Sequence, residues 1–195
     1  KLTNQTTYRL LFHTYVRFGQ VEAMEALTHE ARERFAEPHF FAIDLANYYQ
    51  SRQTYDRSLR EYLTLIQHQN QYLIYATDRI LLMSDDTTNY GLIDSTLNSV
   101  TEFNPDVRLI LAGFYYKTGQ FENALNQHRL IGANKPSDTK RWMNFSENLR
   151  KEKQFDLSVK AYHFLLQNMT ETNPTTVGKA LLGLGQAYEE QIIQN

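Results

Sequence analysis

The chain has 195 residues, of which 42% are hydrophobic and 22% charged, and its 20 basic and 22 acidic side chains leave a formal net charge of −2. A chain of this size and composition can fold around a core, and its near-neutral charge argues against a general electrostatic grip on nucleic acid. The lack of cysteine excludes disulfides, thiolate zinc sites and a cysteine nucleophile.

The residue types favour helices. Proline occurs only four times and glycine eight times, whereas Leu, Gln, Glu, Ala and Arg, which form helices readily, are plentiful. No convincing run alternates Val, Ile or Thr with polar residues as a half-buried strand does. No apolar run reaches the roughly 18 to 20 residues that span a bilayer, so we expect no direct membrane insertion.

A turn-like string recurs along the chain. Residues 17–21 (RFGQV), 117–121 (KTGQF) and 151–155 (KEKQF) resemble one another, and residues 51–55 (SRQTY) are a degenerate fourth copy. The centres of the first and the degenerate copy are 34 positions apart, as are those of the last two, and 66 positions separate these two pairs. The period is therefore 34 residues, with room for one slightly shorter unit in the middle.

This period and the residues at fixed offsets within it resemble the tetratricopeptide repeat family. The best copy is the segment 111–125, followed by Pro136. The resemblance implies an all-α fold, a right-handed α-solenoid of about five helical hairpins plus an unpaired C-terminal helix. We expect one array over residues 1–195, with repeats at about 5–38, 39–72, 73–104, 105–138 and 139–172 and a last helix at 178–194.

Within each predicted repeat, two amphipathic helices bury their apolar faces against each other. The first helix of the second repeat carries Ala42, Leu45, Ala46 and Tyr49, a spacing of three, four and seven that puts them on one face. Small residues are expected where paired helices cross closely, since a bulky side chain would force the pair apart. These are Ala46, Ala112, Ser146 and Gly185 on first helices and Ser58, Ala124 and Ser158 on second helices.

The turns between paired helices are expected to need a left-handed residue. Gly19 and Gly119 suit this conformation, whereas Gln53 and Lys153 at the equivalent places would accept about 1 kcal/mol of strain. The third repeat departs most from the pattern, because residues 85–89 contain no glycine. It is either a repeat with altered packing or a generic helical hairpin that keeps the stack continuous.

The C-terminal segment reads as a first helix that lacks its partner. Residues 180–188 are mostly apolar, and Ile192 and Ile193 follow. Because arrays of this kind need polar caps at their ends, we expect a piece of a longer array. Weak self-association through the uncapped helix is a further expectation.

No nucleotide-binding, hydrolase or zinc-protease motif occurs, and we expect no enzyme and no cofactor. The closest approach to a metal-ligand cluster is Glu25, His29 and Glu33, spaced by four residues. A solvated helix face explains it better, so we expect no metal. His128 and His163 fall at or near core positions, where packing residues are expected.

In the family, first helices line the concave surface of the superhelix. The resemblance therefore implies a partner-binding groove and gives its residues. The subclass that grips the acidic tails of heat-shock chaperones is excluded, because Leu109 and Gly113 stand where its clamp needs Lys and Asn, and Gly183 where it needs Arg. The expected groove residues are Arg9, His13, Arg17, Phe40, Asp44, Asn47, Asp78, Tyr116, Lys117, Lys140, Asn144, Glu147 and Lys151.

The sequence therefore predicts a protein–protein interaction scaffold that holds a peptide or a segment of another protein. Two alternatives stay open. One is a structural spacer or assembly region of a bacterial secretion or exopolysaccharide-export machine, and the other is the regulatory module of an enzyme whose catalytic part lies outside these 195 residues. The compartment, cytoplasm or periplasm, and the identity of the partner also stay open.

Overall fold

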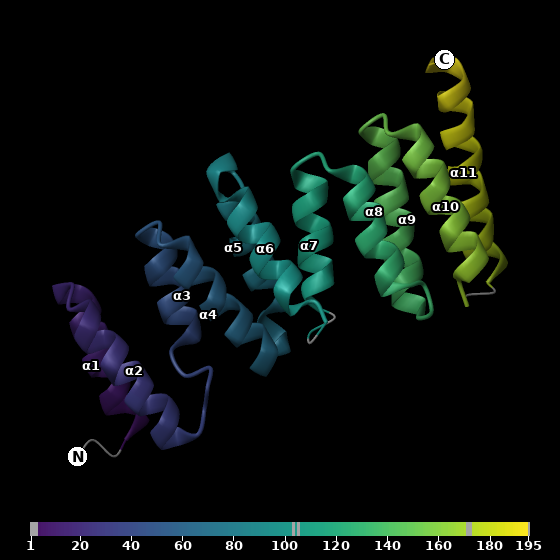
Figure 1. The fold of residues 1–195 in the computed structure, drawn as a ribbon. Coiled ribbons are helices and arrows are strands. Elements are labelled where there is room, and N and C mark those ends of the chain that lie inside the picture. The colour runs from purple at the N-terminus through teal and green to yellow at the C-terminus, as the bar shows by residue number, and fades with distance from the viewer. Residues whose placement is uncertain (1–3, 103, 105, 171–172, 195) are drawn as a thin grey trace. The chain divides into compact units, whose positions relative to one another are not determined.

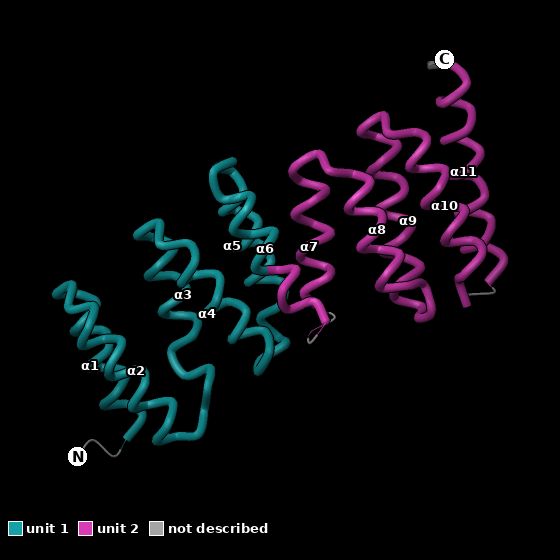
Figure 2. The backbone as a smooth tube through the Cα atoms, in the orientation of Figure 1, with its two compact units in different colours: residues 1–96 teal, residues 97–195 magenta. Residues whose placement is uncertain are grey.

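A computed structural model describes residues 4–102, 104, 106–170 and 173–194, and over these residues the chain is helical, with eleven α-helices and no strand (Figure 1). The all-α prediction is confirmed. The chain divides into two compact units, residues 1–96 and 97–195 (Figure 2). The predicted repeat limits at residues 105 and 172 lie outside the described residues. Among the described helices, none is long and apolar enough to cross a membrane.

Unit 1 contains two helical hairpins, α1 with α2 and α3 with α4, followed by α5 and the start of α6 (Figure 1). The third predicted repeat contains α5 and α6, joined by residues 84–89, which include the 3₁₀ turn η2. The Asp86 side chain accepts from the Thr88 N–H at 2.9 Å and caps this turn. The bounds are α1 Gln5–Phe18, α2 Val21–Phe35, α3 Ala42–Ser51, α4 Tyr55–His68, η1 Asn70–Tyr72, α5 Leu73–Met83, η2 Thr87–Asn89 and α6 Tyr90–Val100.

Unit 2 follows the same local plan. Helix α7 packs against α8, α9 against α10, and α11 against α10. The last helix begins at Pro174, earlier than the predicted 178, because the Asn173 side chain caps the Thr175 N–H at 2.9 Å and proline fits the first turn of a helix. The bounds are α7 Asp106–Lys117, α8 Phe121–Ile131, α9 Pro136–Lys151, α10 Phe155–Asn168 and α11 Pro174–Gln194.

Four tight turns between paired helices use a left-handed residue, as expected from the recurring string. Gly19 and Gly119 have φ of 64° and 75°, and Gln53 and Lys153 adopt 57° and 58° without being glycine. Each of the last two therefore carries about 1 kcal/mol of backbone strain. The short connections hold each second helix against its first.

The crossing points within hairpins are close, as the small residues predict. The Ser58 hydroxyl on α4 donates to the Ala46 carbonyl on α3 at 2.8 Å. The Ser158 hydroxyl on α10 does the same to the Ser146 carbonyl on α9, also at 2.8 Å. Both serines are fully buried, and each bond supplies a buried hydroxyl with an acceptor.

Candidate partner-binding faces

The α1 face expected to bind is exposed. Arg9, His13 and Arg17 follow one another at four-residue intervals and therefore lie on one side of the helix. The Arg9 guanidinium lies 5.0 Å from the centre of the Phe40 ring and 5.8 Å from that of Phe41. These cation–π contacts hold the side chain against the core of unit 1 while its charge stays in solvent.

Phe40 itself is not available to a partner, because only 2% of its surface is exposed. The family offset places it inside the first helix of the second repeat, but α3 begins two residues later, at Ala42. Phe40 instead lies in the loop that leads into α3 and packs against the rings of Phe35 and Phe41. Burial of a large aromatic side chain is worth more here than its exposure on a surface. We therefore remove Phe40 from the expected groove.

Asn47 connects three helices of unit 1. Its Oδ1 accepts from the Tyr62 hydroxyl on α4 at 2.9 Å and from the Tyr75 hydroxyl on α5 at 2.8 Å. Burial raises the pKa of Tyr62, so it donates as a neutral phenol. Asn47 therefore stabilises the packing of α3, α4 and α5. The neighbouring groove candidates are accessible: Asp44 is half-buried and Asp78 exposed.

On α7, the two expected groove residues differ in their surroundings. Tyr116 is half-buried between the rings of Phe121 and Phe145, with centroid distances of 5.3 and 6.2 Å. Burial raises the pKa of Tyr116, and the nearby Glu152 carboxylate raises it further. Lys117 is exposed. Tyr116 joins α7 to the next hairpin, and Lys117 faces solvent.

Helix α9 presents the most complete of the expected faces. Lys140, Asn144, Glu147 and Lys151 are four, three and four residues apart and lie on one side of the helix. Glu147 accepts two hydrogen bonds from the Arg150 guanidinium at 2.9 and 2.8 Å, and these lower the pKa of the carboxyl. Lys140, Asn144 and Lys151 are exposed.

Arg150 also fixes this face relative to α11. Its guanidinium forms an ion pair with Glu190 on α11. The side chain is only 20% exposed, so the two carboxylates hold a charge that is mostly withdrawn from water. The polar surfaces of α9 and α11 are therefore held side by side within unit 2.

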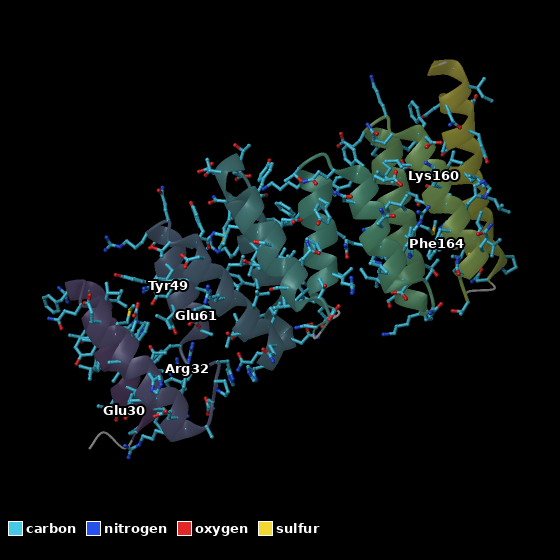
Figure 3. All side chains as sticks on the ribbon, in the orientation of Figure 1. Glu30, Arg32, Tyr49, Glu61, Lys160 and Phe164 are labelled. Carbon is cyan, nitrogen blue, oxygen red and sulfur yellow. The ribbon has the colours of Figure 1, made fainter. Side chains whose placement is uncertain are left out.

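A cleft that the sequence did not indicate lies between α2 and α4. It has a volume of about 410 Å³, and Leu45 and Tyr49 of α3 contribute to its lining. Across this cleft, the Arg32 guanidinium on α2 donates two hydrogen bonds, of 3.3 and 2.5 Å, to the Glu61 carboxylate on α4 (Figure 3). Arg57 on α4 forms an ion pair with Glu25 on α2. Two ion pairs of opposite polarity thus join the second helices of the first two hairpins.

Of the three residues with metal-ligand spacing, Glu25, His29 and Glu33, Glu25 is engaged by residues of the next hairpin. Besides Arg57, it accepts from the Tyr49 hydroxyl at 2.6 Å, and burial together with this bond raises the pKa of Tyr49 to about 12. His29 lies 3.6 Å from Glu33, and both are exposed. Over the described residues, no group of three or more His, Cys, Asp or Glu could hold a metal ion. The sequence does carry a signal for the two ion pairs between α2 and α4, because each acidic residue and its basic partner lie about one repeat apart on the two second helices.

A second cleft, of about 630 Å³, lies in unit 2 where α7, the end of α8 and the start of α9 meet. Arg141 lies at its wall, 3.0 Å from Asp138 and with its Nη2 donating to the Gly132 carbonyl at 2.6 Å. Burial lowers the pKa of Arg141, although Asp138 acts in the opposite direction. The lining of this second cleft includes both acidic and basic side chains, among them Asp106, Arg108 and Lys135.

We expect the Arg32–Glu61 pair to contribute more than an exposed pair does. The side chains are 25% and 16% exposed, and the contact has two hydrogen bonds, so a double-mutant cycle with Arg32→Ala and Glu61→Ala should give a coupling of about 1–2 kcal/mol. The exposed pair Lys160–Asp156 on α10 is the matched control, with about 0.5 kcal/mol or less. Hydrogen-exchange protection of each unit measures both. Equal couplings would show that the cleft does not shield its ion pairs.

Comparison of the chain with protein-family models finds no match, and comparison with curated proteins finds none either. Function is therefore inferred from the residues and contacts above.

Proposed function

We propose that this chain is a protein-interaction scaffold, an α-solenoid of tetratricopeptide-like hairpins whose first helices hold a peptide or a segment of another protein. It holds this partner without catalysing a reaction. The observation that carries it is the face of α9. Lys140, Asn144, Glu147 and Lys151 form an open polar surface on a helix whose other side is packed.

The rigidity of α9 supports a binding role. Its packed side includes Trp142, Ser146 and Leu149, all fully buried, and Arg150 ties it to α11 through Glu190. A surface that is already ordered loses little conformational entropy when a partner docks. The side chains that contact the partner are then the main groups to be ordered.

The charges on α9 indicate what this surface would favour. The Glu147 carboxylate is compensated mainly by Arg150. Lys140 and Lys151 are exposed at the two ends of the face, and the Lys151 Nζ lies 3.9 Å from the Glu147 carboxylate. An extended segment with carboxylates near both ends and a polar centre would match the lysines and the Asn144 amide. Binding would then weaken as salt is raised.

The test compares two exposed asparagines, Asn144 on α9 and Asn126 on the second helix α8. A photo-crosslinking amino acid at position 144 should capture a discrete partner in cells that make the protein, and the same group at position 126 should not. Replacing both Lys140 and Lys151 with Ala should reduce the capture at 144 at least tenfold without changing the far-UV circular dichroism. Equal capture at positions 144 and 126, or capture at 144 that is unchanged when both lysines are replaced, would contradict binding at the α9 face and favour a spacer role.

A further inference from the structure

A third cleft, of about 430 Å³, opens beside the turns of the first two hairpins of unit 1. Its lining residues are Gly19, Val21, Tyr48, Tyr49, Arg52, Thr54 and Arg57. Among the described residues, the lining therefore has two guanidinium groups and no carboxylate. Both walls come from consecutive hairpins of the same unit. A cleft lined by one sign of charge favours a ligand of the opposite sign.

Arg52 supplies the first of the two positive charges. It is the C-cap residue of α3 and is exposed. Its guanidinium carbon lies 5.6 Å from the centre of the half-buried Tyr48 ring. This cation–π contact holds the side chain at the cleft and leaves its N–H groups able to donate. Over the described part of the chain, neither the Arg52 guanidinium nor the Tyr48 hydroxyl has a hydrogen-bond or ion-pair partner.

The second positive charge is already compensated. Arg57 forms an ion pair with Glu25 on α2, and its guanidinium carbon lies 5.5 Å from the centre of the Tyr49 ring. The two arginines and Glu25 together leave one positive charge at the cleft. This balance matches the single negative charge of a carboxylate better than the charge of about −1.5 to −2 on a phosphate monoester.

Two helices begin at this cleft. Helix α2 starts at Val21, and α4 starts directly after Thr54, and neither start has a side-chain cap. The N–H groups of a first helical turn and the positive end of the helix dipole favour a nearby anion. Glu22 and Asp56 in these first turns offset part of this field, but neither lines the cleft. The helix starts therefore add to the attraction that Arg52 exerts.

The corresponding turn of unit 2 shows that the fold does not require these arginines. A shift of 100 residues, from position 53 to 153, places the left-handed residues of both turns at the same position. Glu152 then takes the place of Arg52. Leu157 takes the place of Arg57, and it lines a cleft of about 390 Å³ together with the acidic Asp156. The turn forms with either sign of charge, so the arginines of unit 1 are free to serve another purpose.

We propose that the cleft beside Arg52 binds a glutamate side chain of a partner protein. The guanidinium of Arg52 would donate two parallel hydrogen bonds to the carboxylate, and the Tyr48 hydroxyl would donate a third. The methylene groups of the glutamate would pack against Val21 and the Tyr48 ring. This cleft lies in unit 1, whereas the α9 face lies in unit 2, so either interaction can fail without the other.

The test uses the full chain labelled with ¹⁵N and a capped pentapeptide, a central glutamate with two alanines on each side. In nuclear magnetic resonance spectra, the peptide should shift the amide signals of Val21 and Thr54 and the Nε–H signal of Arg52 in a saturable way. The same peptide with glutamine in the centre should not, because it carries no charge. The Gln154 amide, at the corresponding turn of unit 2, should respond to neither peptide.

Changing Arg52 to Gln should weaken binding of the glutamate peptide at least about tenfold, because the charge and the paired donors are lost. Arg52 is exposed, so the circular dichroism should stay unchanged. The matched control is Arg60→Gln, which removes another exposed arginine outside this cleft and should bind as the wild type does.

Equal shifts with the glutamine peptide, or unchanged binding by the Arg52→Gln variant, overturn the proposal. Binding that is at least tenfold tighter when phosphoserine replaces the glutamate overturns it in favour of a phosphopeptide. Shifts of the same signals that grow with protein concentration in the absence of peptide, and that Arg52→Gln abolishes, overturn it in favour of a second copy of the chain.

Discussion

Replacing Trp142 with Ala should lower the free energy of unfolding of unit 2 by about 3–5 kcal/mol. The side chain is fully buried. Its ring stacks on Phe164 at 4.6 Å and lies 5.6 Å from the His128 ring, measured between centroids. Truncation leaves a cavity among the rings of α8, α9 and α10 that helices in a hairpin cannot close without losing other contacts.

The hydrogen bond of the indole adds little to this loss. Its Nε1 donates to the Gly132 carbonyl at 2.8 Å, but Arg141 donates to the same oxygen at 2.6 Å. The carbonyl therefore keeps a partner when the indole is removed, and the cost comes from the ring. A Trp142→Phe variant, which keeps part of the ring volume, should lose less than half as much.

Hydrogen exchange followed by mass spectrometry measures the effect in each unit. Amides of α8, α9 and α10 should lose protection in the alanine variant, whereas those of α1 to α3 should not change. A loss below about 1 kcal/mol would show that the packing around Trp142 relaxes freely.

The sequence predicted the helices of this chain well where local residues decide the structure. The string at residues 17–21 and its copies located four left-handed turns, including those at Gln53 and Lys153, because the turn is set by a few neighbouring residues. The spacing of small residues located two crossings, Ser58 over Ala46 and Ser158 over Ser146, because a helix presents the same face every three to four residues.

Side-chain partners across helices could not be predicted in this way. The family offset places Phe40 in the groove, but its position depends on the loop that precedes α3. Asn47 bonds to two tyrosines that follow it by 15 and 28 residues. The four-residue spacing groups Glu25 with His29 on its own helix, although its partners Tyr49 and Arg57 come from the next hairpin. Periodicity predicts on which face of its helix a residue lies, but it does not predict which residue of another helix contacts it.

His128 should make the stability of unit 2 fall as the solution is acidified. Its imidazole is 8% exposed and packs against the Phe145 ring at 4.1 Å between centroids. Burial lowers the pKa of His128 to about 3, and the positive charge of Arg141 contributes in the same direction. The Nδ1 atom is buried without a hydrogen-bond partner among the described residues. The folded chain therefore holds the neutral imidazole in a place that cannot accommodate its charge.

Because the unfolded chain titrates near the ordinary histidine pKa of about 6.5, it takes up the proton before the folded chain does. The stability that depends on neutral His128 is fully present above about pH 6.5 and is lost as the pH falls toward 3. Between pH 7.5 and 4.5 the expected loss is about 2–3 kcal/mol. Carboxylates also titrate toward the lower end of this range, so the quantity of interest is the difference from a His128→Phe variant, which cannot take up the proton.

Trp142 is the chain's only tryptophan and lies beside His128, so its fluorescence reports the unfolding of unit 2 in urea at each pH. The wild type should lose about 2–3 kcal/mol more than His128→Phe between pH 7.5 and 4.5. At pH 7.5 the two proteins should differ little, because a phenyl ring fills the same site between Trp142 and Phe145. Equal losses in both proteins would mean that the protonated imidazole finds water or a carboxylate, which requires α8 and α9 to separate locally while the rest of unit 2 stays folded.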